Sequence, residues 1–361
     1  MKRSSGILAL GLAALCLSGC GRKGPLRPPA SPRPAAVSGL AVRQRGASVV
    51  LDWVNPSRAV DGRPLRAVQA VEVWVLDLGA GSAGPPVAAR DFAARARLGR
   101  RVPAPDLRPA ETGAGVSAVC PLPGDGFRPA RLAFSVRVLD EKGRASELCP
   151  AVPVEVRACP RPPEIRQAEV FADRIEVRWE APAANIDGSA PAAVAGYTVW
   201  RAEGGAAPVK LTPEPVAGPV FDDRDFRFGA AYDYTVRAVA PGAGPAVESD
   251  ASAPRRVAPR DTFPPAPPSG LVALSGAGVI SLSWTAGREA DLAGYRVWRR
   301  EAGGSEFVPL NPGPLLRANA FTDTTAVKGA TYVYAVSAAD ASGNESPRTE
   351  TGPIGLKGAE G

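Results

Sequence analysis

A pattern of aromatic residues that recurs along the chain constrains its fold more than any other sequence feature. Two stretches, residues 194–238 and 292–346, share a Gly-Tyr-x-Val-Trp-Arg segment, a later phenylalanine and then a Tyr-x-Tyr-x-Val segment. In both, the phenylalanine precedes the first tyrosine of the last segment by eleven residues. Agreement in residue type and spacing indicates tandem copies of one structural unit. The matched residues are Tyr197, Trp200, Phe221 and Tyr232 in the first stretch and Tyr295, Trp298, Phe321 and Tyr332 in the second.

A more diverged copy comes earlier in the chain. One of its segments ends at a tryptophan after alternating apolar residues, the next reads Val-x-Val-Trp, and the third reads Phe-x-Val where the later copies have Tyr-x-Val. A turn of the form Asp-x-x-Gly-x-x-Ser also recurs, at residues 140–146 and 340–346. The diverged copy therefore belongs to the same series. Its residues Trp53, Trp74 and Phe134 correspond to Trp179, Trp200 and Tyr234 and to Trp284, Trp298 and Tyr334.

Apolar and polar residues alternate within these segments, which predicts β-strands with one buried face. Proline and glycine, 39 of each, exclude long helices and suit short strands joined by turns. About seven such strands per hundred residues are typical of a β-sandwich. We therefore predict an all-β fold built from tandem sandwiches.

The tryptophan on the second strand and the late Tyr-x-Tyr-x-Val strand resemble the fibronectin type III domain, an immunoglobulin-like sandwich. The resemblance implies that Tyr232 and Tyr332 form that family's tyrosine corner; Leu132 stands at this position in the first copy. Proline-rich joins, Arg-Pro-Pro and Pro-Pro-Ala-Pro-Pro, separate the copies. We predict a diverged fibronectin type III-like domain at residues 37–158 and fibronectin type III domains at residues 162–258 and 266–356.

The beginning of the chain has the form of a bacterial lipoprotein signal. Two basic residues at positions 2 and 3 precede an apolar run over residues 6–17, which is too short to cross a bilayer. The run ends in Leu-Ser-Gly-Cys20, which resembles a lipobox. That resemblance implies a signal peptide over residues 1–19, cleavage before Cys20, and a membrane attachment through acyl chains on this cysteine.

Residues 20–36 form a basic, proline-rich tether. Gly21 is not the aspartate associated with inner-membrane retention, so the resemblance implies an outer-membrane anchor, facing either the periplasm or the exterior. Residues 20–26 read Cys-Gly-Arg-Lys-Gly-Pro-Leu, which resembles the start of small lipoproteins of the lipopolysaccharide-translocon maturation type. The alternative is a spacer that lifts the first domain off an anionic surface.

The net charge of +7 comes from the beginning of the chain. Eight basic residues and no acidic residue precede residue 46, so residues 46–361 sum to −1. A near-neutral globular part argues against a basic stripe for phosphates, and we predict no nucleic-acid partner.

Motifs that carry chemistry are weak. The chain has no histidine, which removes the commonest general base and the commonest transition-metal ligand. Glycines within residues 79–84 match a dinucleotide-binding fingerprint, but two prolines follow them in place of a helix, which indicates a turn. Asp222, Asp223 and Asp225 could hold calcium, yet the last copy has an aspartate at the same turn, which favours a turn preference. We predict no catalytic residue, no cofactor and no metal.

Three cysteines follow Cys20. Outside the cytoplasm they can oxidise, and an odd number leaves one thiol over. In the predicted topology Cys120 and Cys159 end strands near the same pole of the first sandwich, whereas Cys149 begins a strand at the opposite pole. We predict a Cys120–Cys159 disulfide, with the other two pairings open.

The six tryptophans fall into two sets. Trp53, Trp179 and Trp284 belong to the predicted cores. If Tyr295 and its second neighbour point inward, the period-two alternation of a strand turns the other set outward. An outward strip of tryptophan and arginine suits partner contact; the alternative is that an edge strand or basic side chains cover the rings. The residues of this predicted binding surface are Trp74, Trp200, Trp298, Arg296 and Arg300.

These observations predict an outer-membrane lipoprotein that acts as a non-catalytic binding, scaffold or spacer protein. Its partner would be an envelope protein or a glycan. The alternative is an accessory factor of envelope assembly, of the lipopolysaccharide-transport type, that acts through residues 20–36. An enzyme is disfavoured because the three predicted domains leave no stretch for a catalytic domain.

Overall fold

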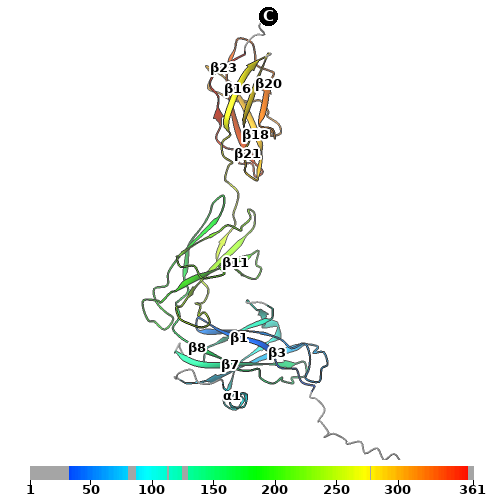
Figure 1. The fold of residues 1–361 in the computed structure, drawn as a ribbon, viewed down its shortest axis with the longest axis vertical. Coiled ribbons are helices and arrows are strands. Elements are labelled where there is room, and N and C mark those ends of the chain that lie inside the picture. Colours follow the sequence, from blue (N-terminus) through cyan, green and yellow to red (C-terminus); the bar gives the residue numbers. More distant parts are fainter. Residues whose placement is uncertain (1–31, 80–86, 112–113, 124–128, 277, 357–361) are drawn as a thin grey trace, which may run out of the picture. The chain divides into compact units, whose positions relative to one another are not determined.

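The computed structural model describes residues 32–79, 87–111, 114–123, 129–276 and 278–356. Within these ranges nearly all regular structure is β-strand, and the strands form antiparallel sheets that pair into three sandwiches (Figure 1). The predicted all-β fold is confirmed. The chain divides into two compact units. The first holds residues 50–123 and 130–155, and the second holds residues 43–49 together with the chain from residue 156 onward.

The first sandwich pairs a sheet of order β1-β2-β6-β5 with a sheet of order β4-β3-β7-β8. Strand β3 pairs antiparallel with both β4 and β7, so β4 lies at an edge of its sheet. The strands are β1 (Ser38–Arg45), β2 (Ser48–Val54), β3 (Val68–Asp77), β4 (Arg97–Pro103), β5 (Arg108–Pro109), β6 (Val116–Pro121), β7 (Ala130–Asp140) and β8 (Val152–Val156).

The second and third sandwiches repeat one plan, β13-β10-β9 over β12-β11-β14-β15 and β16-β17-β20 over β19-β18-β21-β22, with β23 also paired to β21. This is the strand order of a fibronectin type III-like sandwich. The second contains β9 (Glu164–Val170), β10 (Ile175–Glu180), β11 (Gly196–Glu203), β12 (Val209–Lys210), β13 (Val220–Asp223), β14 (Tyr232–Val239) and β15 (Arg255–Val257). The third contains β16 (Ser269–Gly276), β17 (Val279–Thr285), β18 (Leu292–Glu301), β19 (Val308–Pro309), β20 (Ala320–Asp323), β21 (Thr331–Asp340), β22 (Thr349–Glu350) and β23 (Ile354–Gly355).

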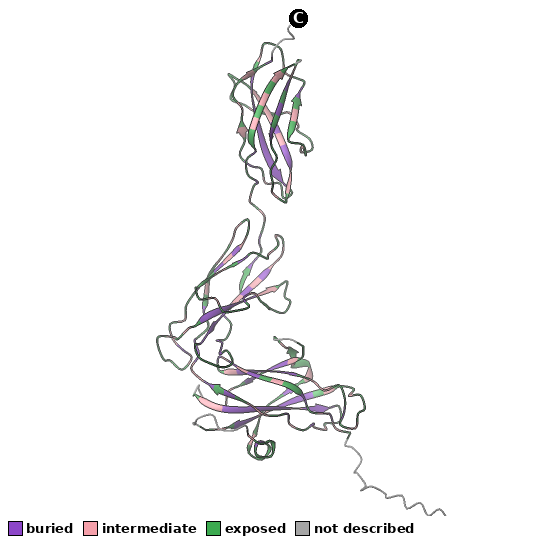
Figure 2. Cartoon of the chain, in the orientation of Figure 1, coloured by how far each residue is buried: buried purple, intermediate pink, exposed green. Residues whose placement is uncertain are grey.

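Each sandwich buries the inward residues of its strands, and Figure 2 shows buried and exposed residues interleaved along them. The predicted core tryptophans Trp53, Trp179 and Trp284 are 1%, 4% and 3% exposed, which confirms their assignment. In the second and third sandwiches this ring meets a tyrosine of the next strand edge to face, with centroids 5.2 Å apart. Such pairs add specificity to the apolar burial.

The tyrosine corner predicted for the second and third copies is present. The hydroxyl of Tyr232 accepts a hydrogen bond from the backbone N–H of Arg227, five residues upstream, at 2.9 Å. The hydroxyl of Tyr332 accepts one from Val327 at 3.2 Å. Leu132 occupies the same register in the first sandwich and is buried, so this copy fills the corner with an apolar side chain.

The recurring Asp-x-x-Gly turn follows strands β7 and β21. The carboxylate of Asp140 accepts hydrogen bonds from backbone N–H groups within its turn, and the Asp340 carboxylate accepts one at the equivalent place. Gly143 and Gly343 have φ values of 71° and 89°, a left-handed conformation that glycine adopts without steric cost. The sequence pattern therefore reflects the geometry of the turn.

A short helix, α1 (Ala89–Arg95), follows the glycine-rich residues of the first sandwich. The two prolines that follow the glycines predict a turn there and no helix. The helix begins after those prolines and buries Phe92 against Leu76 and Ala133, on the outer face of the β3–β7 sheet. A helix of seven residues is too short to be stable by itself. The burial of Phe92 against the sheet stabilises it.

Candidate functional site

Cys20, the predicted lipidation site, lies outside the described residues, as do the predicted signal peptide and most of the tether. Among the described residues no helix is long and apolar enough to cross a membrane. Lipidation at Cys20 and outer-membrane anchoring therefore stay predictions from the sequence.

The strand alternation predicted for the second set of tryptophans is present. Tyr295 and Val297 are buried in the third core, while Trp298 lies on the opposite face of β18 with Arg296 and Arg300. The equivalent tryptophans of the other sandwiches lie at the same register, opposite residues of β7 and β14. The three rings thus face outward from their sheets, and what covers them decides whether they can contact a partner.

Trp200 is covered by charged and polar side chains of its own domain. The ring is 6% exposed, and the guanidinium of Arg237 lies over it, 4.3 Å from the ring centroid. Its indole N–H donates to Thr198, whose hydroxyl donates to Glu248. Glu248 also pairs with Arg237 at 3.2 Å, which closes the network. This ring is a structural part of the second sandwich.

Trp298 is partly exposed and has a similar cover. Arg348 places its guanidinium 3.7 Å from the ring centroid and 5.4 Å from that of Phe307. The indole N–H donates to Ser337 at 3.0 Å. Arg300 lies over Phe307 and pairs with Glu350, and Arg296 pairs with Glu345 at 3.8 Å. The two arginines of the predicted surface are therefore bound to neighbours in the third sandwich.

Trp74 is covered in yet another way. Arg137 of β7 lies 4.8 Å from its ring centroid, and both the indole N–H and the Arg137 guanidinium donate to Glu72. The ring also packs with the cluster that Phe92 of α1 forms on this face. All three outward rings thus carry an arginine, which favours the alternative of basic side chains that cover them. For Trp74 and Trp200 the sequence contained a signal for this cover, because Arg137 of β7 and Arg237 of β14 occupy equivalent positions in the two repeats.

A buried group of three side chains recurs in the second and third sandwiches. Asp323 is 2% exposed, and its carboxylate accepts hydrogen bonds from the hydroxyl of Tyr334 and the guanidinium of Arg299, both at 2.7 Å. Thr325 donates to the other oxygen through its backbone N–H and its hydroxyl. Asp223, Arg201 and Tyr234 repeat the arrangement, with 2.6 Å between hydroxyl and carboxylate. The sequence predicts these aspartates as turn residues, and no motif in it indicates their buried partners.

The buried setting changes the pKa values of this group. Burial would raise the pKa of Asp323, but the hydrogen bonds from Tyr334, Thr325 and Arg299 together hold it below its usual range. Burial raises the pKa of Tyr334, and its bond to the Asp323 carboxylate raises it further. At neutral pH the group is an ion pair with a neutral tyrosine, and it has no free acid or base.

The first sandwich lacks this group. Arg201 is opposite Tyr234 and Arg299 is opposite Tyr334, whereas the same register of the first sandwich holds Val75 opposite Phe134. The divergence of the first copy therefore replaces a buried ion pair with apolar contacts, which can be neutral or favourable for stability.

The predicted Cys120–Cys159 disulfide is absent from the structure. The three cysteines of the described chain, Cys120, Cys149 and Cys159, are buried free thiols. Cys120 packs in the first unit, whereas Cys159 packs with Ala240 and Val247 in the second, so different cores enclose the two sulfurs. Burial, with the charges of nearby aspartates, raises the pKa of Cys159 to about 12. Cys159 lies past β8, the last strand of the first sandwich, and not at the end of that strand as predicted.

Three carboxylates converge at one end of the third sandwich, where oxygens of Asp261, Asp291 and Asp340 lie within 4.8 Å of one another. Asp340 accepts hydrogen bonds from the backbone and the side chain of Asn344, and Asp261 accepts one from Ser342 at 2.8 Å. These bonds tie the carboxylates of Asp340 and Asp261 to the turn that follows β21. The absence of a metal stays a prediction for this chain.

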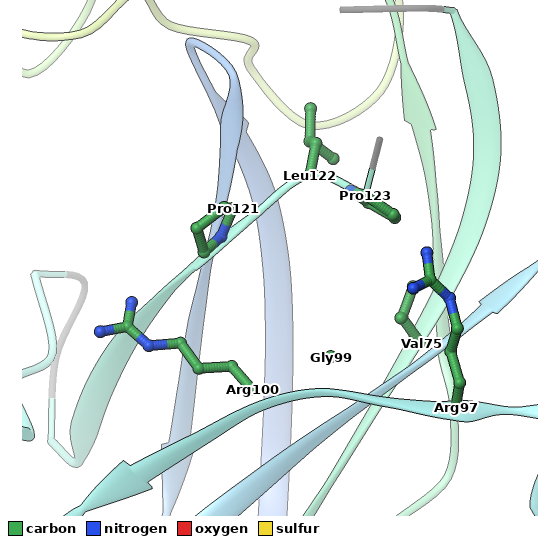
Figure 3. Close-up of a pocket in the computed structure, with 7 residues that line it drawn as sticks. All are labelled: Val75, Arg97, Gly99, Arg100, Pro121, Leu122 and Pro123. Carbon is green, nitrogen blue, oxygen red and sulfur yellow. The ribbon is translucent and has the colours of Figure 1, made fainter. Parts of the chain in front are cut away.

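A pocket of about 290 Å³ opens at the margin of the first sandwich, between edge strand β4 and the end of β6. Figure 3 shows Arg97 and Arg100 on either side of Gly99 along β4, with their guanidinium groups at opposite ends of the pocket and the segment Pro121 to Pro123 across from the strand. One wall is therefore cationic and the other apolar. No motif in the sequence pointed to this pocket.

Comparisons with known proteins give partial matches. No protein-family model matches the chain. Over 227 residues, 59% of the chain, it is 31% identical to exoglucanase B of Cellulomonas fimi, and it covers 19% of that protein. Over 87 residues, 24% of the chain, it is 37% identical to the amylopullulanase of Thermoanaerobacterium saccharolyticum, of which it covers 6%. The chain thus spans less than a fifth of either relative.

Among solved structures, the FN1-FN3 domains of chicken CNTN1 match 90% of this chain and 100% of that one, at 15% identity and a TM-score of 0.25.

Proposed function

We propose that this chain is a lipid-anchored, non-catalytic binding or spacer protein of the bacterial outer membrane. The observation that carries the proposal is the Leu-Ser-Gly-Cys20 segment at the end of a short apolar run, followed by a basic tether and three folded sandwiches. Acyl chains on Cys20 would hold the protein at the membrane, since several chains bind far more strongly than one.

A binding or spacer role suits the chemistry of the sandwiches. The buried ionisable groups of the second and third sandwiches, such as Asp223 and Asp323, are engaged in ion pairs and hydrogen bonds. The outward tryptophans are covered by arginines. The partner is an envelope protein or a glycan. The names of the two relatives, an exoglucanase and an amylopullulanase, are those of enzymes that act on glucans, which favours a glycan.

Metabolic labelling with a palmitate analogue tests the anchor. In a bacterial host the full chain should take up the label and sediment with outer-membrane vesicles on a density gradient. A Cys20→Ser chain should take up no label and leave the membrane fraction. Equal labelling of the two chains, or an unlabelled wild-type chain, would refute the anchor at this residue.

The tether supports a second candidate, an accessory role in envelope assembly of the lipopolysaccharide-transport type. The Cys-Gly-x-Lys-Gly-Pro-Leu run favours this role, and it would act through residues 20–36 alone. If the signal peptide with residues 20–36 restores a deletion phenotype, the tether carries the function. If restoration needs the sandwiches, the binding role stands, and crosslinking in intact cells would then identify the partner.

A further inference from the structure

Positive charge is concentrated on the first sandwich, although residues 46–361 as a whole are nearly neutral. Residues 37–158 contain 17 basic and 12 acidic residues, whereas residues 162–258 contain 10 and 14. Strand β4 has the sequence RLGRRVP, with three exposed arginines and no acid. None of these arginines forms an ion pair within the described parts of the chain, in contrast to the arginines that cover the tryptophans.

The pairing of β4 with β3 sorts the three arginines by face. Arg97 is opposite Val75, and Arg100 is opposite a valine that is also buried in the core. Both side chains therefore leave the edge strand on its core-facing side, at the open margin of the sandwich. Arg101 is opposite Glu72, on the outer face that carries Trp74. Arg97 and Arg100 line the pocket, and Arg101 does not.

The pocket combines two kinds of wall. Arg100 donates a hydrogen bond to the carbonyl of Val119, which holds its guanidinium across the margin between β4 and β6. Gly99 leaves the space between the two arginines without a side chain (Figure 3). Guanidinium groups bind carboxylate and phosphate with paired, charge-assisted hydrogen bonds. The opposite wall, Pro121 to Pro123, offers apolar contact to the rest of a ligand.

The volume of the pocket and the irregular edge of strand β4 favour a sugar over a peptide as the ligand. At about 290 Å³ the pocket lies at the lower limit of typical ligand sites and suits one ring-sized group. A peptide would bind an open sheet edge by adding a strand. The register of β4 shifts between Val73 and Trp74, and this irregularity interrupts the row of edge hydrogen-bonding groups that strand addition requires.

We propose that this pocket binds an acidic sugar unit of an anionic glycan. Arg97 holds the carboxylate or phosphate of the unit, and its ring lies against the segment Pro121 to Pro123. The inference rests on the proposed binding role and names the ligand class for it. Charge on an edge strand also prevents pairing with other sheets, but in that role Arg97 and Arg101 would be equivalent.

The test compares how substitution of Arg97 and of its neighbour Arg101 changes the affinity for an acidic sugar. The full chain, purified in an uncharged detergent, is titrated by calorimetry with oligogalacturonate as the carboxylate probe and with a phosphorylated mannan oligosaccharide as the phosphate probe. We expect at least one of them to bind, and to bind more weakly as salt is added. Arg97→Gln should weaken binding roughly tenfold or more, whereas the control Arg101→Gln, on the other face of the same strand, should change it less than twofold.

The proposal would be overturned by no binding of either probe at low salt, by equal losses in the two variants, or by equal binding of uncharged maltohexaose. Tighter binding of polyglutamate than of both sugars would assign the pocket to an acidic protein and would also overturn it. Palmitate labelling at Cys20 does not depend on this pocket. A failed titration with normal labelling would therefore refute the glycan site and leave the anchor intact.

Discussion

Removal of Asp323 should strongly destabilise the third sandwich, because it breaks the buried ion pair with Arg299. In an Asp323→Ala chain, Arg299 keeps a half-buried charge and Tyr334, which is fully buried, loses the acceptor of its hydroxyl. Breaking a buried pair on one side costs about 3–5 kcal/mol. Each 1.4 kcal/mol changes an equilibrium constant tenfold, so the equilibrium constant for opening of this sandwich should rise more than about a hundredfold.

Hydrogen exchange resolved by peptide is the suitable assay, because a chain of several domains does not unfold in two states. Amides of β21 should lose protection in the variant, while those of β14 should not, since the second sandwich keeps its own intact group around Asp223. Tyr334→Phe should cost only about 1 kcal/mol, because the carboxylate retains the donors of Arg299 and Thr325.

An apolar triple variant separates an ion-pair effect from simple loss of packing. Arg299→Met, Asp323→Leu and Tyr334→Phe together leave no buried charge without a partner, as in the first sandwich with Val75 and Phe134. This chain should be more stable than Asp323→Ala alone. If it is less stable, or if Asp323→Ala costs less than a tenfold loss of protection, the reasoning is wrong.

The same aspartate predicts a pH dependence. The folded state lowers the pKa of Asp323 relative to the unfolded chain, so its contribution to stability is complete above the unfolded value of about 3.9. The contribution is lost as the pH falls through the lower folded value. The difference in β21 protection between wild type and Asp323→Ala should therefore narrow below about pH 4. A difference that stays constant down to pH 2 would contradict this assignment.

Three further predictions follow from the contacts. Trp200→Ser should destabilise the second sandwich by about 3 kcal/mol or more, because it uncovers Arg237 and leaves a cavity; unchanged exchange would mean that the ring is a dispensable surface group. All three described thiols should react with maleimide in unreduced, denatured protein, while Cys159 in native protein should resist it at pH 8, since its pKa is about 12; fewer than three labels would reinstate a disulfide. Tyr232→Phe should cost about 1 kcal/mol by removing the acceptor of the Arg227 N–H, and an unchanged midpoint in denaturant would show that water replaces it.

Local pattern and spacing were enough to predict several features. Alternation and turn residues gave the strands, and the Tyr-x-Tyr-x-Val segments located the corner tyrosines with their hydrogen bonds. The inward and outward tryptophans also follow from the period of a strand, because successive side chains must point to opposite faces. The proposed anchor at Cys20 rests on the sequence alone, since an enzyme would read such a signal from an extended segment before any domain packs.

Other features depend on which segments meet, and a linear pattern does not specify that. Arg348 covers Trp298 from across the sheet, α1 covers the face of the first sandwich, and Cys159 packs in a core apart from that of Cys120. The pocket at β4 requires the margins of two sheets to lie opposite each other. The sequence by itself therefore determined the strands and the repeats, and it carries the proposed lipidation signal, because these are local. Tertiary structure decided which rings are covered, which charges are paired and where a ligand could enter, because those depend on contacts between residues far apart in the chain.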